Sequence, residues 1–312
     1  MPAQRQASST VLGVLALLIL AGLIIFGVQA LAGAGSMGGA VAPAPSAARV
    51  SLSEAVIGDD VAAVKAALSS GADPNASIVT DKPGREGMTA LIHAAYEGKA
   101  ETLRALIDAK AKVEARTEDG RTALMYAAGW GDAPKVKLLL DAGARTDARA
   151  SDGWTALMWA AARGEPASVK ALVQAGADVN AANKWRQTAL MAAGRSGSAE
   201  KVALLLESGA TANAADMNGD TALSIAAAND TPPAVIEALA RAGAPVNSTD
   251  ADGVTPLMKA AERGDAEVVA ALLRLGADVQ AKDRANGWTA REWATKRDDE
   301  KGRAVVKALE AR

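Results

Sequence analysis

Apolar and polar positions alternate along this chain in short blocks, and the blocks return in the same order at a fixed distance. One block, "TALMWAAARG" (155–164), is short and rich in alanine. After a break comes a second block, in which Val169, Leu172 and Val173 recur with the spacing of a helix face. The pattern predicts two antiparallel helices of about ten residues, each with one buried side.

Polar and small residues indicate where these helices begin and end. Thr155 is expected to cap the first helix by accepting a hydrogen bond from a backbone N–H, and Gly164 to end it in the left-handed conformation. Ala160 and Ala161 are small enough for neighbouring helices to approach closely. The stretch "AGADVNA" (175–181) supplies a glycine stop after the second helix, followed by Asp and Asn residues that favour a turn.

This two-helix unit recurs along most of the chain. Each unit opens on a mark that stands two positions before a Thr-Ala or Thr-Pro pair, and the spacing between marks is 33 or 34 residues; the marks are Gly87, Gly120, Gly153, Arg186, Gly219, Gly253 and Gly287. Because one helix pair cannot bury its apolar faces alone, the pairs are expected to stack into a continuous core. Residues 51–312 are therefore predicted to form a single elongated all-α domain.

The pattern resembles the ankyrin repeat, whose signature is G-x-T-P-L-H-x-A-A-x-x-G followed later by G-A-D-V-N. The resemblance covers about 51–312 and implies a solenoid of stacked helix-turn-helix units with finger loops. Tetratricopeptide repeats match poorly, because their longer helices lack this Gly-Asp-Asn finger. Apolar packing is expected to replace the family's histidine hydrogen bond, since the histidine position holds Ile92, Met125, Met158, Met191, Ser224 and Met258. His93, the only histidine, sits one place later and is interpreted as a helix residue without chemistry.

The two ends of the array depart from the repeat as the ends of a solenoid should. Residues 51–75 look like a shortened first repeat, and Arg291 stands where the last unit should carry a leucine. Two insertions interrupt the period. Residues 76–86 lengthen the first finger, and residues 228–235 lengthen one turn between helices.

The chain begins with a long apolar segment. Residues 11–32 contain no charge, and none occurs between Arg5 and Arg49. As a helix, this segment is long enough to cross a bilayer. Positive charge on its leading side predicts a single-pass anchor, with residues 1–10 in the cytoplasm and the repeats outside the inner membrane, in the periplasm.

A cleaved signal peptide is the alternative interpretation of the same segment. The sequence Ala-Leu-Ala at 30–32 fits a small-x-small cleavage site and would leave a soluble exported protein. The apolar run is longer than the usual signal core, which favours the anchor. Residues 33–50, rich in Gly, Ala and Pro, are predicted to form a flexible linker in front of the repeats.

Composition then narrows the chemistry. The chain has no cysteine, so it has neither a thiolate zinc site nor a cysteine nucleophile. His93 is its only histidine and thus the only imidazole that could act as a base. The Asp/Asn pairs of the fingers match no calcium loop, and "GAGSMGG" (33–39) lacks the lysine of a phosphate loop. A net charge of −2 offers no basic excess for nucleic acid. We expect a non-catalytic protein with no cofactor, metal site, small-molecule substrate or nucleic-acid partner.

Function is therefore expected at a surface. The resemblance implies that protein partners contact the fingertips and the exposed side of the first helices, and Trp, Tyr and Arg are enriched in binding hot spots. The residues of these types at such positions are predicted to bind the partner: Tyr96, Trp130, Trp154, Arg163, Trp185 and Arg195. Trp154 is expected to project from a finger, whereas Trp159 and Tyr126 are expected to pack nearer the helix contacts. The opposite side is expected to be a solvated charged face that includes Lys135, Lys170 and Glu207.

These observations predict a bacterial ankyrin-repeat adaptor or scaffold, tethered to the membrane, that binds protein outside the cytoplasm. The alternative is an accessory factor that stabilises or protects one exported enzyme.

Overall fold

The computed structural model describes residues 50–78 and 87–311, which fall within one compact unit, Ala48–Arg312. The expected tail (1–10), the apolar segment (11–32) and nearly all of the linker (33–50) lie outside the described residues. The described part contains sixteen α-helices and, instead of strands, four isolated β-bridges. None of its helices is long and apolar enough to cross a membrane.

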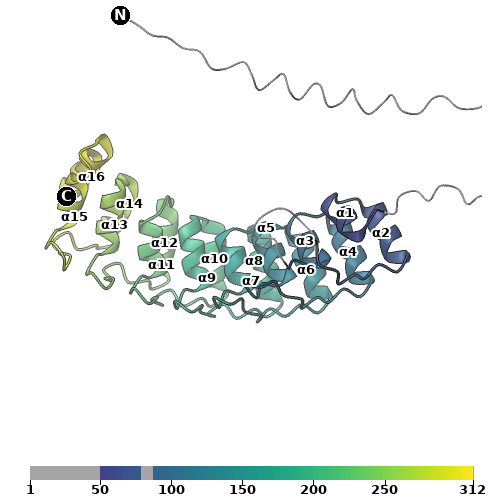
Figure 1. Cartoon of the computed structure of the whole chain (residues 1–312). Helices are drawn as coiled ribbons and strands as arrows, with labels where there is room; N and C mark the ends of the chain where they lie inside the picture. The colour runs from purple at the N-terminus through teal and green to yellow at the C-terminus, as the bar shows by residue number, and fades with distance from the viewer. Residues whose placement is uncertain (1–49, 79–86, 312) are drawn as a thin grey trace, which may run out of the picture. The chain divides into compact units, whose positions relative to one another are not determined.

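The helices form consecutive pairs, as the repeat predicts (Figure 1). In each pair the odd-numbered element is the first helix and the even-numbered element is the second helix. The pairs are α1 (Leu52–Ile57) and α2 (Val61–Ser69), α3 (Ala90–Tyr96) and α4 (Ala100–Asp108), α5 (Ala123–Trp130) and α6 (Ala133–Asp141), α7 (Ala156–Ala162) and α8 (Pro166–Gln174), α9 (Ala189–Ser196) and α10 (Ala199–Glu207), α11 (Ala222–Ala227) and α12 (Pro233–Arg241), α13 (Pro256–Arg263) and α14 (Ala266–Arg274), and α15 (Ala290–Thr295) and α16 (Glu300–Glu310).

Packing between repeats arranges the helices in two rows. Each first helix contacts the next first helix, each second helix contacts the next second helix, and the two helices of a pair contact each other. Close approach within the first row depends on fully buried alanines such as Ala160 and Ala161. Between the rows lie buried Leu and Val side chains, among them Val169 and Leu172 of α8. The continuous core expected from the sequence is confirmed.

Local capping agrees with the sequence at one end of α7 and not at the other. Thr155 caps the helix by accepting a hydrogen bond from the backbone N–H of Met158, as expected. The expectation for Gly164 is wrong, because its φ is not positive and Arg163 occupies the C-cap. A Cβ at Gly164 would lie 2.0 Å from the carbonyl oxygen of Ala128. This glycine therefore lets adjacent repeats approach, rather than turning the chain.

The fingers bind one another through backbone and side-chain groups. The N–H of Ser151 donates to the carbonyl of Asp119 in the preceding finger (2.8 Å), and the N–H of Lys184 donates to Asp152 (3.1 Å). Asn180 lies in the turn, where its N–H donates to the Asp178 carboxylate at 2.9 Å, and it also bridges to the next repeat. Its side chain accepts from the N–H of Thr211 at 2.8 Å and donates to the carbonyl of Gly209 at 3.0 Å. The turn expected at "GADVN" thus also holds two repeats in register.

Two expectations about individual side chains need correction. Lys135 does not belong to a solvated face, because it is buried and its Nζ donates to the carbonyl of Gly98 at 3.0 Å. Lys170 and Glu207 are exposed, as expected. At the family's histidine position the methionines and Ile92 are buried, which confirms apolar packing there, but Ser224 instead forms a capping box with Thr221.

Candidate partner-binding face

The first helices leave one side open to solvent. In α7 the residues from Ala156 to Ala161 are buried except Trp159, and exposure returns at Arg163. In α9 the same spacing leaves Ala192 partly exposed and Arg195 exposed. Because residues three or four apart share one side of a helix, these positions define a common exposed strip. We call this strip, together with the fingertips next to it, the first-helix face.

Aromatic rings gather on this face over three consecutive repeats. Tyr96 of α3 meets Tyr126 and Trp130 of α5 edge-on, with ring centroids 5.6 and 5.9 Å apart. Trp130 lies 4.7 Å from Trp159 of α7, which in turn lies 4.6 Å from Trp154. We call these five rings the aromatic row. It takes both tyrosines and three of the six tryptophans of the chain, so aromatic side chains are concentrated here.

Two guanidinium groups lie over the aromatic row. The Cζ of Arg121 is 4.7 Å from the ring centroid of Trp159 and 6.0 Å from that of Tyr126. The Cζ of Arg163 is 5.4 Å from the centroid of Trp130. Such cation–π contacts hold the arginines against the rings. Burial raises the pKa of the Tyr126 hydroxyl, with nearby Asp119 adding to this effect, so this hydroxyl keeps its proton at neutral pH.

The structure brings together four of the six residues predicted to bind a partner. Tyr96, Trp130 and Trp154 are half-buried members of the aromatic row, and Arg163 lies exposed against it. Trp185 stands apart on its fingertip and is 49% exposed. Arg195 is exposed at the end of α9. Their role in binding stays a prediction.

The expected contrast between Trp154 and Trp159 is wrong. Both side chains are half-buried, and their rings pack on each other. Arg121 was not among the residues predicted to bind, although it directly follows a repeat mark and lies over the row. The sixth position after the mark carries an aromatic residue in two neighbouring units, Tyr126 and Trp159. This repetition was a signal in the sequence that rings of adjacent repeats could meet.

A small pocket lies beside the last ring of the row. It measures about 150 Å³ and opens between α7 and α9. Trp154, Met158, Met191 and Ala192 supply apolar surface, and Arg195 is the only charged residue of the lining. In the two preceding units an aromatic ring stands at the position of Ala192. The pocket therefore opens where the small side chain of Ala192 replaces a ring.

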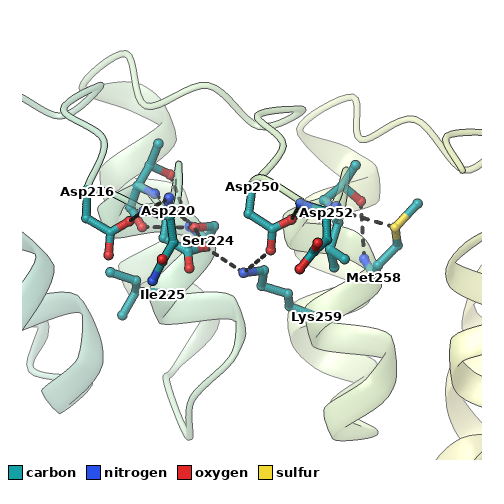
Figure 2. Close-up of polar contacts among 12 residues, drawn as sticks. Asp216, Asp220, Ser224, Ile225, Asp250, Asp252, Met258 and Lys259 are labelled. Atoms are coloured by element: carbon teal, nitrogen blue, oxygen red, sulfur yellow. Dashed lines mark hydrogen bonds and ion pairs between the residues drawn. The ribbon is translucent and has the colours of Figure 1, made fainter. Parts of the chain in front are cut away.

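Further along the face the same position carries a charge instead of a ring. Lys259 of α13 lies between two acids of successive fingers, with its Nζ 2.6 Å from Asp220 Oδ1 and 2.8 Å from Asp250 Oδ2 (Figure 2). Ser224 also donates to Asp220 at 2.7 Å. Burial alone would lower the pKa of Lys259, but the bonds to Asp220 and Asp250 outweigh it and raise the pKa. The ammonium is therefore charged at neutral pH and joins two repeats.

The described residues contain no group of three or more His, Cys, Asp or Glu side chains placed to hold a metal ion. His93 is buried in α3, with its Nε2 3.9 Å from Glu97 Oε2. What the first-helix face offers is aromatic area, guanidinium groups and one ring-sized pocket. These features suit recognition of another molecule by contact.

A comparison with protein families agrees with this architecture. The family model described as ankyrin repeats, in three copies, matches residues 52–150, 112–183, 132–216, 157–250 and 223–309. No curated protein matches the chain significantly. The matched ranges cover the helix pairs from α1 to the last turn of α16. Together with the paired helices and stacked fingers, they establish that the chain belongs to the ankyrin-repeat family.

Proposed function

We propose that this protein is a non-catalytic binding module whose first-helix face holds a polypeptide partner. The observation that carries the proposal is the aromatic row with Arg121 and Arg163 against it. Ankyrin repeats generally mediate contacts between proteins and are generally non-catalytic. Trp, Tyr and Arg are the residue types that most often dominate the free energy of binding at protein interfaces.

Contiguity makes the row more than a set of surface residues. Its members come from three repeats and contact one another in series, with Tyr126 buried and the other four rings partly exposed. Because the row stands on packed helices, a partner would find it preformed, which lowers the entropic cost of association.

The site of action is proposed from the sequence. Residues 11–32 would anchor the chain in the inner membrane of a bacterium, with the repeats in the periplasm, or would be removed as a signal peptide. Sequencing the N-terminus of the mature protein separates these outcomes. If the mature chain starts at Gly33, the anchor is wrong and the protein is soluble after export.

Two roles fit a binding module at this place. As an adaptor or scaffold it would hold several proteins, whereas as an accessory factor it would stabilise or protect one exported enzyme. Affinity capture of the full chain from its own cell envelope, by a tag at the C-terminus, distinguishes them. Several unrelated partners support the scaffold, one stoichiometric enzyme supports the accessory factor, and loss of all partners in a Trp130→Ala and Arg163→Glu double variant assigns them to the first-helix face.

A further inference from the structure

The aromatic row ends before α9. This helix continues the array of first helices, but it has no aromatic residue at the position that would carry the next ring. Tyr126 and Trp159 occupy the sixth position after their repeat marks, and Ala192 occupies the same position in the next unit. The space that a ring at this position would fill is the pocket of about 150 Å³. An apolar cavity of about this volume holds a benzene ring. The pocket is therefore the size of the ring that the row lacks.

The lining of the pocket suits a phenyl group in particular. Trp154, the last ring of the row, forms one wall, and an incoming ring can stack on it. Met158 and Met191 supply two more apolar walls, and thioether sulfur makes favourable contacts with aromatic rings. On the finger side, Gln187 accepts a hydrogen bond from Asn183, and its side-chain N–H₂ donates to no other described residue. That amide is free to donate to a carbonyl or carboxylate oxygen.

One basic side chain lines this pocket, and two more stand next to its lining residues Asn183 and Gln187 in the sequence. Arg195 lines it, and Lys184 and Arg186 lie exposed on the finger of the same repeat. Within the described part of the chain, none of these three groups forms an ion pair. An apolar pocket with basic groups that pair with no acid at it and on the adjoining finger is complementary to an acidic segment with one apolar anchor.

The backbone of this finger adds a separate observation. Arg186 has φ +62° at the mark where every other unit carries a glycine. The left-handed conformation is unfavourable for a residue other than glycine, because its Cβ comes too close to the following carbonyl oxygen. The same finger has Trp185, which is 49% exposed, where the other fingertips carry Asp, Asn or Glu directly before the mark. This unit thus carries a basic and aromatic tip at some cost to its own stability.

We infer that the pocket between α7 and α9 binds a phenylalanine or tyrosine side chain of an acidic polypeptide segment, whose carboxylates lie against Arg195, Arg186 and Lys184. The bound ring continues the aromatic row by one member, on Trp154. This inference rests on the proposed function and gives its partner a chemistry.

The test uses short random peptides displayed on phage and selected against the full chain. We expect the selected peptides to carry one Phe or Tyr among Asp and Glu residues. Their affinity should fall at least about tenfold on Ala192→Trp, which fills the pocket, and on Arg195→Glu, which reverses the charge in its lining. Ala192→Trp should not lower the melting temperature, because Trp159 occupies the equivalent position in the preceding repeat.

Matched variants on other surfaces control for the added ring and for the charge reversal. Lys137→Trp places an indole on the second-helix side, and Arg303→Glu reverses an exposed charge on α16. Neither should change the affinity. If selected peptides lack the acidic and aromatic pattern, or if Ala192→Trp and Arg195→Glu bind them as the wild type does, the inference is wrong while the binding function stands.

Two further outcomes are distinct. If the full chain selects no peptide and captures no partner from its own cells, both the inference and the proposed function fail. If phosphatidylglycerol vesicles bind the chain and Trp185→Ala abolishes that binding, the basic finger serves an anionic membrane surface, which overturns the inference.

Discussion

The ring centroids of Trp154 and Trp159 lie 4.6 Å apart, so a residue beside a repeat mark and one in the middle of α7 form a single packed unit. Through Trp130 this unit continues into α5, and Arg121 lies over Trp159. Stability and recognition therefore share the same side chains on this face. Substitutions in the row must be tested for both.

The first prediction concerns the coupling of these two rings. Trp159→Ala should destabilise the domain by about 3–5 kcal/mol, as removal of a packed aromatic side chain does. Trp154→Ala should cost about 1–3 kcal/mol, and the double variant should cost less than the sum, because each single variant already removes their contact. Urea denaturation followed by circular dichroism measures all three. Trp185→Ala, on an exposed ring, should stay within about 0.5 kcal/mol. Additive effects of Trp154→Ala and Trp159→Ala would refute the packed unit.

Two lysines on α6 provide a matched pair. Lys135→Met should cost about 1–3 kcal/mol, because the buried carbonyl of Gly98 loses its donor. Lys137→Met removes the same charge from an exposed position and should stay within about 0.5 kcal/mol. Thermal and urea unfolding of the two variants give the comparison. Equal effects would mean that Lys135 does not reach the preceding repeat.

Lys259 should make stability depend on alkaline pH. Its pKa is raised in the folded state, so its contribution is fully present below the ordinary lysine pKa, about 10.4, and disappears as pH rises through the folded value. At pH near 7, Lys259→Met should cost about 1–3 kcal/mol, because Asp220 and Asp250 lose their partner.

The stability difference between wild type and Lys259→Met should therefore shrink above pH ~10.4, as measured by urea midpoints across a pH series. Lys170→Met, at an exposed position, should show no such dependence. A difference that stays constant up to pH ~11 would argue against the ion-paired cluster.

Gly164 should be restricted by packing rather than by its backbone angle. Gly164→Ala should cost about 1–3 kcal/mol or more, because the new Cβ collides with the carbonyl of Ala128. Gly176→Ala is the contrast, with φ +81° and open space around the Cβ, and should cost about 1 kcal/mol. Thermal melts rank the two variants. A smaller loss from Gly164→Ala than from Gly176→Ala would contradict the role in repeat packing.

The period of the sequence was sufficient to predict the fold. A mark every 33 or 34 residues, followed by a helix-capping threonine such as Thr155 and an alanine-rich helix, predicts paired helices that stack. The structure has these pairs, and their alanines are buried between repeats. Individual side chains were less predictable, because a repeat pattern does not report contacts between units. Lys135 looks solvated within its own helix, and only the position of Gly98 in the preceding repeat explains its burial.

The candidate face could be predicted in outline but not in its connections. Aromatic residues at finger and helix-end positions indicated Tyr96, Trp130 and Trp154, yet the sequence could not reveal that their rings meet in series. The pocket could not be predicted from the sequence for a related reason. It results from the absence of a ring at Ala192, which becomes evident only when this position is compared with Tyr126 and Trp159 in the preceding repeats.

The most direct test of the binding face is site-specific photocrosslinking in the cells that make the protein. A benzophenone amino acid is placed in the full chain at Arg163 or Arg195 on the first-helix face, and at Lys137 or Lys170 on the second helices. All four side chains are exposed, so none of these replacements disturbs the core. Our account predicts covalent adducts with a protein partner from Arg163 and Arg195 and none from Lys137 and Lys170. Adducts formed only from the second-helix positions would contradict it.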